Sequence, residues 1–217
     1  MKEIYVSPSI LAASFTDIKK AISEIEKAGA DWIHCDVMDG VFVPNITFGQ
    51  KMVSDIRKIS QLPLDVHLMI MKPEKYVEEF IDCGANSITI HYESSAVVPQ
   101  ILEKIRERGV KAGISIKPGT DVSALRQYLD SVDMITVMSV QPGFAGQAYI
   151  PEVTEKIVKV KEMIEERQII LQVDGGININ NIAEVIDAGA DSVVAGSVFF
   201  NSKDKAETVK ILKRLDA

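Results

Sequence analysis

The sequence predicts an α/β fold, a TIM (β/α)8 barrel in which residues 1–217 form a single domain. Eight short apolar runs alternate along the chain with amphipathic helical patterns, and no linker interrupts them. A similar phrase also precedes three of these runs, as AGAD at 28–31, CGAN at 83–86 and AGAD at 188–191. The glycines of these phrases are spaced as two and then four units of about 27 residues, which is about one eighth of the chain.

Each strand and helix follows from this alternation. Runs rich in Val, Ile and Leu, which are typical of buried parallel strands, lie near residues 4–9, 32–37, 63–68, 87–91, 111–116, 133–138, 169–173 and 192–195. The segments between them have helical periodicity, and the glycine of each repeated phrase is expected to end a helix as its C-cap. A doubly wound sheet is the main rival, but such sheets usually have fewer units and a less regular spacing.

The composition of the chain limits the kinds of partner and the cellular location that we expect. The chain has 24 basic and 31 acidic residues, a formal net charge of −7 and no basic cluster, which argues against nucleic acid or an anionic membrane as partner. No apolar stretch approaches the roughly 20 residues of a membrane span, and no signal peptide is visible. Two cysteines, Cys35 and Cys83, make no disulfide framework. We therefore expect a cytoplasmic protein that binds a small molecule.

Histidines and aspartates lie near the ends of several predicted strands. All three histidines of the chain lie toward the ends of strand-like runs, and His34 shares one strand face with Asp36, two residues further on. Because barrel strands bring their carboxyl ends to one rim, we expect a divalent metal to be bound there. Zinc, iron(II), manganese or cobalt would suit the donor set His34, Asp36, His67 and Asp174. His91 is expected to have a supporting or structural role.

Glycine-rich loops follow the last three predicted strands. Such loops let backbone N–H groups approach an anion closely, and this corner of a TIM barrel is its usual phosphate site. We therefore expect these loops to bind a phosphate group of the substrate. The residues concerned are Gly143, Phe144, Ala145 and Gly146 after the sixth strand, Gly175 and Gly176 after the seventh, and Gly196 and Ser197 after the eighth.

A metal beside carboxylates and a phosphate site at one corner indicate a sugar phosphate as substrate. The difficult step would be removal of a proton from a carbon next to a ketone, for which a carboxylate base is suited. Asp36 and Asp174 come from strands far apart around the barrel, so they could reach a bound substrate from opposite faces. Met38, Met69 and Met138 have inward parity and either line the pocket or fill the core.

Six phrases along the chain are distinctive: SPSILAASF at 7–15, HCDVMDGVFVPNITFG at 34–49, DVHLMI at 65–70, PGFAGQ at 142–147, VDGGIN at 173–178 and VAGSVFF at 194–200. In these phrases, and over essentially its full length, the chain resembles the ribulose-phosphate 3-epimerase family. The resemblance implies interconversion of D-ribulose 5-phosphate and D-xylulose 5-phosphate at C3, in the pentose phosphate pathway. It also implies zinc or iron(II) as the metal, and a homo-oligomer.

The resemblance further assigns roles to individual residues. Asp36 would be the first base and Asp174 the proton donor in one direction, with these roles exchanged in reverse. Ser9, His67 and the glycine loops would contact the substrate. Ala145 stands where the family typically has a second adjacent glycine, a version that resembles D-allulose 6-phosphate 3-epimerases. A six-carbon ketose phosphate therefore stays open as an alternative substrate.

Two further segments depart from the usual pattern of the family. KPGT at 117–120 replaces the more usual NPAT, and SSAVVPQ after Glu93 lacks the family's common phrase.

Barrel decarboxylases and aldolases that bind sugar phosphates typically centre catalysis on a lysine, for which Lys117 is the sole candidate here. A barrel that binds sugar phosphates without catalysis is the remaining alternative, and the complete set of candidate catalytic residues argues against it.

Overall fold

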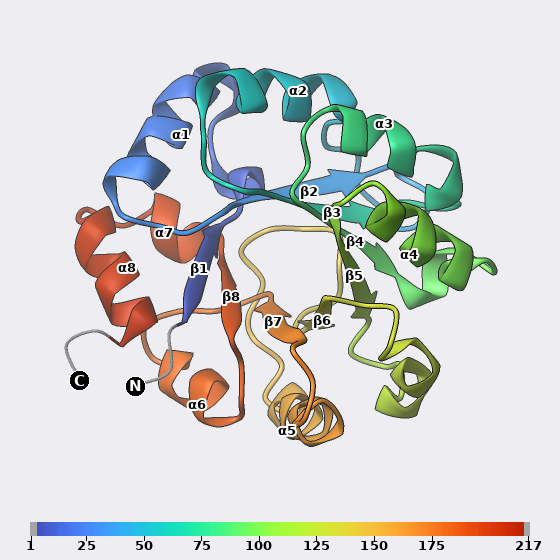
Figure 1. Cartoon of the computed structure of the whole chain (residues 1–217). Helices are drawn as coiled ribbons and strands as arrows, with labels where there is room; N and C mark the ends of the chain where they lie inside the picture. The colour runs from blue at the N-terminus through green and yellow to red at the C-terminus, as the bar shows by residue number, and fades with distance from the viewer. Residues whose placement is uncertain (1–3, 215–217) are drawn as a thin grey trace.

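The computed structural model describes residues 4–214, in which eight parallel strands form one sheet that curls into a barrel (Figure 1). The strands follow the order β1-β8-β7-β6-β5-β4-β3-β2 around the sheet. A parallel bridge between Ser9 and His34 links the end of the first strand to the second. The predicted TIM barrel is confirmed, and the doubly wound alternative is wrong.

The strands occupy the predicted segments to within one residue at each end. Runs of Val, Ile and Leu bounded by glycine or polar residues mark them clearly, because both faces of each strand are covered. The strands are β1 (Tyr5–Pro8), β2 (Ile33–Met38), β3 (Leu64–Met69), β4 (Ser87–His91), β5 (Lys111–Ile116), β6 (Met134–Met138), β7 (Ile170–Asp174) and β8 (Ser192–Ala195).

Helices cover the outside of the barrel (Figure 1). They are α1 (Ile18–Lys27), α2 (Gln50–Ile59), α3 (Val77–Asp82), α4 (Val98–Glu107), α5 (Val153–Met163), α6 (Ile182–Asp187), α7 (Ser197–Phe200) and α8 (Lys205–Lys213). Short 3-10 helices add η1 (Ile10–Ala12), η2 (Phe15–Asp17), η3 (Pro73–Lys75) and η4 (Tyr92–Ser94). After β5 the connection is a 3-10 helix, η5 (Val122–Tyr128). Its buried residues, Leu125 and Tyr128, are spaced three apart, which is the repeat of a 3-10 helix.

The repeated glycine phrases end helices, as predicted. Gly29 follows α1, Gly84 follows α3 and Gly189 follows α6, with φ of 74°, 90° and 117° respectively. Residues with a Cβ rarely adopt these left-handed angles, so glycine reverses the chain there at low cost. Each reversal feeds the chain into the next strand of the barrel.

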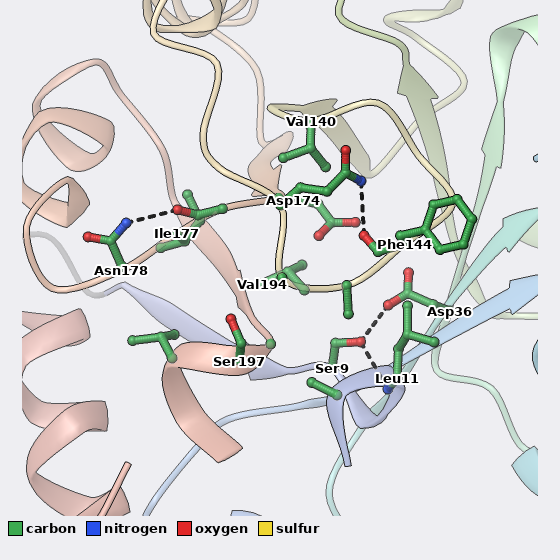
Figure 2. Close-up of a pocket in the computed structure, with 18 of the residues that line it drawn as sticks. Ser9, Leu11, Asp36, Val140, Phe144, Asp174, Ile177, Asn178, Val194 and Ser197 are labelled. Carbon is green, nitrogen blue, oxygen red and sulfur yellow. Dashed lines mark hydrogen bonds between the residues drawn. The ribbon is translucent and has the colours of Figure 1, made fainter. Parts of the chain in front are cut away.

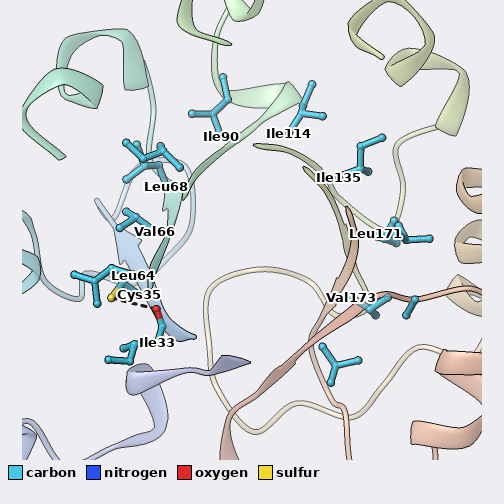
Figure 3. Close-up of a cluster of buried hydrophobic side chains, with 14 of the residues drawn as sticks. Ile33, Cys35, Leu64, Val66, Leu68, Ile90, Ile114, Ile135, Leu171 and Val173 are labelled. Carbon is cyan, nitrogen blue, oxygen red and sulfur yellow. Dashed lines mark hydrogen bonds between the residues drawn. The ribbon is translucent and has the colours of Figure 1, made fainter. Parts of the chain in front are cut away.

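The apolar core lies between the strands and the helices. Figure 3 shows Ile33, Cys35, Leu64 and Val66 pointing outward from the ring of strands, and these side chains belong to one large buried cluster. Each fully buried Ile or Leu contributes about 1.5–3 kcal/mol. Cys35 therefore points away from the barrel interior, because neighbouring residues of a strand alternate between its two faces.

The barrel interior is polar, in contrast to this outer layer. Successive residues of a strand point to opposite faces, so the inward positions alternate with the apolar ones. Eight buried polar side chains lie at such positions below the candidate site: Ser7, Asp65, Ser87, Thr89, Ser115, Thr136, Gln172 and Ser192. Within residues 4–214, no helix combines the length and the apolar character needed to cross a bilayer.

Candidate active site

A cavity of about 620 Å³ lies at the carboxyl ends of the strands. Figure 2 shows Asp36 and Asp174 in its wall, with Ser9 beside Asp36 and with Asn178 and Ser197 on the other side. Of the residues expected from the sequence, the cavity is lined by Ser9, Asp36, Met38, Met69, Met138, Gly143, Phe144, Ala145, Gly146, Asp174, Gly175, Gly176, Gly196 and Ser197. Residues of β2, β3, β6 and β7 and of the segments after β1, β6, β7 and β8 therefore meet here.

Four predicted metal ligands lie together beside this cavity. One nitrogen or oxygen from each of His34, Asp36, His67 and Asp174 lies within 4.8 Å of the others, and all four residues are buried. Asp36 Oδ1 is 3.2 Å from His34 Nε2 and 3.3 Å from His67 Nδ1, while Asp174 Oδ2 is 3.8 Å and 3.4 Å from the same two nitrogens.

The spacing of these donor atoms fits a small divalent ion. Four ligands placed about 2.0–2.1 Å from a zinc ion form a tetrahedron with edges of about 3.4 Å. Two imidazoles and two carboxylates also suit borderline metals better than magnesium, which prefers oxygen. The cluster is therefore compatible with a divalent metal site.

The two histidines lie beneath the cavity rather than in its lining. His34 and His67 are almost completely buried, within β2 and β3 respectively. Asp36 and Asp174 are the members of the cluster that reach the cavity. The expectation that His67 contacts the substrate therefore stays a prediction.

The outer nitrogen of each histidine has its own buried partner. His34 Nδ1 donates to Asp65 Oδ2 at 2.8 Å, and Ser87 Oγ and Gln172 Nε2 donate to the same carboxylate. His67 Nε2 lies 2.9 Å from His91 Nε2. Such partners orient metal-binding imidazoles, and they leave His34 Nε2 and His67 Nδ1 facing the two aspartates.

The electrostatics of the cluster favour a cation. Burial lowers the pKa of His34, but Asp36 and Asp65 outweigh it and raise the pKa well above the ordinary value. Burial also lowers the pKa of His67. Asp174 and Asp36 raise it by more, so the net shift is an increase. Burial raises the pKa of Asp36, but His34 and His67 bring it well below its usual range. The imidazoles and the carboxylates thus each favour the charged form of the other.

Ser9 holds the second oxygen of Asp36. Its hydroxyl donates to Asp36 Oδ2 at 2.5 Å, a hydrogen bond of the short type that a charged acceptor forms. The two oxygens of Asp36 are therefore distinct, because Oδ1 faces the histidines and Oδ2 faces Ser9 at the cavity. This fixes the orientation of the carboxylate.

The glycine loops reach the same cavity with backbone conformations that suit glycine. Gly176 has φ of 65°, and a Cβ there would lie 2.3 Å from the backbone nitrogen of Tyr149. Gly143 has φ of 135°, and its carbonyl accepts from Asn45 Nδ2 at 2.8 Å. This hydrogen bond ties the loop after β6 to the loop after β2.

Comparison with known proteins decides the family. A sequence profile of the ribulose-phosphate 3 epimerase family matches residues 5–200. A ribulose-phosphate 3-epimerase from Synechocystis sp. is 48% identical over 212 residues, which cover 96% of this chain and 92% of that protein. The chain belongs to the ribulose-phosphate 3-epimerase family. A second relative of that name, from Bacillus subtilis, is 41% identical and covers 97% of this chain and 98% of its own length.

Solved structures support the fold of this epimerase-family chain. A 3-keto-L-gulonate-6-phosphate decarboxylase from Vibrio cholerae has a TM-score of 0.75 at 14% identity, covering 98% of this chain and 97% of that one. A 3-hexulose-6-phosphate synthase from Salmonella typhimurium has a TM-score of 0.74 at 15% identity and covers 98% of both chains. At such low identity the likeness shows the barrel alone.

Several residues of this site were not predicted from the sequence. Asp65 lies two residues before His67 and Gln172 two before Asp174, so the strand period of two could have placed both on the inward face. Other missed residues line the cavity from loops and short helices, where the strand period does not apply, and Val194 lines it from β8. Those from loops and short helices include Leu11, Ala12, Val140, Ile177, Asn178, Val198 and Asn201.

Proposed function

We propose that the protein is a ribulose-phosphate 3-epimerase that interconverts D-ribulose 5-phosphate and D-xylulose 5-phosphate. The observation that carries the proposal is the meeting of Asp36 and Asp174, from β2 and β7, in the wall of a cavity whose other loops are rich in glycine. Two carboxylates from separate strands can serve two faces of one carbon atom, which inversion at that carbon requires. The two relatives described above are named ribulose-phosphate 3-epimerase, which supports the same reaction.

In this proposal a divalent metal is bound by His34, Asp36, His67 and Asp174. Zinc or iron(II) is the proposed metal, and manganese or cobalt would fit the same donors. A metal held there would act as a Lewis acid toward the ketone oxygen of the substrate and so acidify the neighbouring C3–H. The compact, buried donor set supports this assignment.

The two aspartates would then move the proton. Asp36 removes the C3 proton of D-ribulose 5-phosphate as the electron pair of that bond enters the enediolate, and Asp174 delivers a proton to the opposite face of C3 as that pair forms the new bond. The reverse reaction exchanges the two roles. Ser9 orients Asp36 through the hydrogen bond to Oδ2. Base catalysis of this kind typically contributes a factor of about 10²–10⁴.

The remaining cavity residues would hold the substrate and exclude water. The glycine loops after β6, β7 and β8 are proposed to bind the phosphate through backbone N–H groups. Met38, Met69 and Met138 line the cavity beside the carboxylates. Their apolar, polarizable side chains would limit solvent at the reacting carbon and so slow the escape of the transferred proton.

The alternatives from the sequence have less support. The relatives named above are ribulose-phosphate 3-epimerases, so they do not favour a six-carbon ketose phosphate. A lysine-centred decarboxylase or aldolase is also disfavoured, because no lysine lines the cavity among the described residues. Lys117 instead has its Nζ 3.8 Å above the ring centre of Phe42.

Deuterium exchange tests the proposed function directly. Protein loaded with zinc or iron(II) is incubated with D-ribulose 5-phosphate in deuterated water, and NMR follows C3. We expect D-xylulose 5-phosphate to form with deuterium at C3, and kcat/KM to be lower for D-allulose 6-phosphate. Absence of both product and exchange in metal-loaded, folded protein would contradict the proposal. A chelator should abolish turnover and lower the melting temperature, since a ligand that binds the native state stabilises it.

Location and assembly are part of the same proposal. We propose a cytoplasmic enzyme, consistent with its two free cysteines, Cys35 and Cys83. We also propose a homo-oligomer, as the family resemblance implies. Light scattering coupled to gel filtration tests the assembly, and a mass of one chain of 23.9 kDa at working concentration would contradict it.

A further inference from the structure

A chain of hydrogen bonds leads away from the metal cluster through two buried histidines. His67 turns Nδ1 toward Asp36 and Asp174, while its Nε2 lies 2.9 Å from Nε2 of His91. His91 Nδ1 in turn lies 3.3 Å from Glu93 Oε2. His91 and Glu93 are outside the four-residue donor set, and the proposed reaction gives them no role.

The far end of this chain is fixed to the loop after β5. Glu93 Oε1 accepts from the backbone N–H of Lys117 at 2.9 Å and from the hydroxyl of Thr120. Lys156 Nζ donates to three backbone carbonyls of this turn, including those of Lys117 and Thr120 at 3.1 and 2.6 Å. Glu93 therefore has one oxygen committed to these donors, and its other oxygen faces His91.

The carboxylate of Glu93 decides which ring nitrogen of His91, and in turn of His67, carries a proton. An ionised carboxylate only accepts, so His91 must donate from Nδ1 and carry a lone pair on Nε2. The facing nitrogen of His67 must then donate, because two imidazole nitrogens at this distance share one proton. A neutral His67 with its proton on Nε2 has its lone pair on Nδ1, which is the atom that faces Asp36 and Asp174.

We infer that His91 and Glu93 are positioning residues that fix the tautomer of His67 and so direct its Nδ1 lone pair to a divalent metal. The inference rests on the proposed metal site. It also explains why a third histidine, for which a supporting or structural role was expected, is buried at the end of β4.

Packing around the two rings holds this arrangement in place. The rings of His67 and His91 stack with centres 4.9 Å apart and planes at 22°, and both residues are fully buried. The ring of Phe42 lies 4.7 Å from that of His91. Rotation of either imidazole would break a buried hydrogen bond, which costs about 1–3 kcal/mol for each group left unpaired.

Substitution Glu93→Gln tests the inference at a residue remote from the metal. Lys117 and Thr120 both donate to one oxygen of this side chain, so the glutamine oxygen should stay with them and its NH2 group should face His91. His91 would then accept at Nδ1 and carry its proton on Nε2. This would push the proton of a neutral His67 onto Nδ1, where it competes with the metal.

We expect Glu93→Gln to weaken zinc binding by about 10–100-fold, the usual effect of losing an outer partner of a metal-binding histidine. Zinc affinity is measured by competition with a chromogenic chelator, on protein whose melting curve shows it to be folded. Glu74→Gln is a matched control, because Glu74 accepts from Ser95 in the neighbouring loop and does not contact either histidine. Its zinc affinity should match that of the unaltered protein. A zinc affinity of folded Glu93→Gln within twofold of the unaltered protein would overturn the inference.

A measurement on the unaltered protein keeps the inference testable if Glu93→Gln does not fold. Long-range 1H–15N spectra of the imidazoles should show His91 protonated on Nδ1 and not on Nε2, with or without zinc. A proton on His91 Nε2 would overturn the inference. If the unaltered protein binds no zinc, the proposed metal site fails while this spectrum still reports the tautomer, so the two failures can be told apart.

Discussion

Asp65 accepts a hydrogen bond from His34 across the interface of β2 and β3, with 2.8 Å between Oδ2 and Nδ1. Both residues are buried, and their backbones pair in the strand register. Ser87 and Gln172, from two further strands, also donate to this carboxylate. Asp65 thus orients the imidazole so that Nε2 faces Asp36, the arrangement found where a carboxylate supports a metal-binding histidine.

Asp65→Asn should weaken zinc binding by about 10–100-fold. An asparagine that keeps its oxygen toward His34 and Gln172 would turn its NH2 group toward the Ser87 hydroxyl, which can accept, so His34 would lose a charged acceptor and keep a neutral one. We expect a lower melting temperature as well, because a hydrogen bond to a charged acceptor is stronger by about 1 kcal/mol than one to a neutral acceptor. Chelator competition and thermal melting measure the two effects. Asp133→Asn is the control, since Asp133 caps the N–H of Ala112 away from the metal cluster. Unchanged zinc affinity in Asp65→Asn would show that its role is structural alone.

Asp36→Asn and Asp174→Asn should separate proton removal from epimerisation. Starting from D-ribulose 5-phosphate in deuterated water, Asp174→Asn should retain slow exchange at C3, because Asp36 can still remove and return a proton on its own face. Asp36→Asn should lose both exchange and product from this substrate. The pattern should reverse with D-xylulose 5-phosphate, and kcat should fall by about 10²–10⁴ in either variant. Metal content is measured in each variant, because both residues are proposed ligands. The same pattern with both substrates in metal-loaded protein would argue against two bases.

Gly176→Ala should damage the proposed phosphate site. The added Cβ would lie 2.3 Å from the backbone nitrogen of Tyr149, and φ of 65° is unfavourable for alanine. We expect a loss of stability of about 1–3 kcal/mol and a higher KM, measured by denaturation and by steady-state kinetics. Gly49→Ala is the matched control, because a Cβ there meets nothing within 4 Å. Equal effects of the two substitutions would rule out the steric argument.

Glu93 should make stability depend on pH in acid. Burial raises its pKa, but hydrogen bonds from His91, Thr120 and the Lys117 N–H outweigh this and lower the pKa from 4.5 to about 2. A pKa that is lower in the folded state means that the stabilisation is present above about pH 4.5 and is lost as the pH falls toward 2.

The matching measurement compares the unaltered protein with Glu93→Gln by urea denaturation across this range. We expect Glu93→Gln to be less stable by about 1–2 kcal/mol at pH 7, because a charged hydrogen-bond acceptor is lost. The difference should shrink below pH 4.5, where protonation makes Glu93 neutral as well. A difference that stays constant down to pH 3 would contradict the assignment.

Local patterns explain how much of the fold was predicted. Strand bounds were correct to within one residue because covered parallel strands are continuous apolar runs, and Gly29, Gly84 and Gly189 marked helix ends through their backbone freedom. The 3-10 helix after β5 was not predicted, since a spacing of three between Leu125 and Tyr128 also fits an α-helix in a short segment. Periodicity alone cannot separate the two.

Alternation along each strand was enough to predict which residues share its inward face, because alternation is a local property. It placed His34 with Asp36, and the repeat of the barrel put Asp174 on the same rim. Three-dimensional packing was needed to show that His34 and His67 lie beneath the cavity, that Asp65 orients one of them and that His91 contacts the other. These relationships depend on strand register and ring packing between segments far apart in the chain, and neither is encoded in the spacing of residues along any one segment.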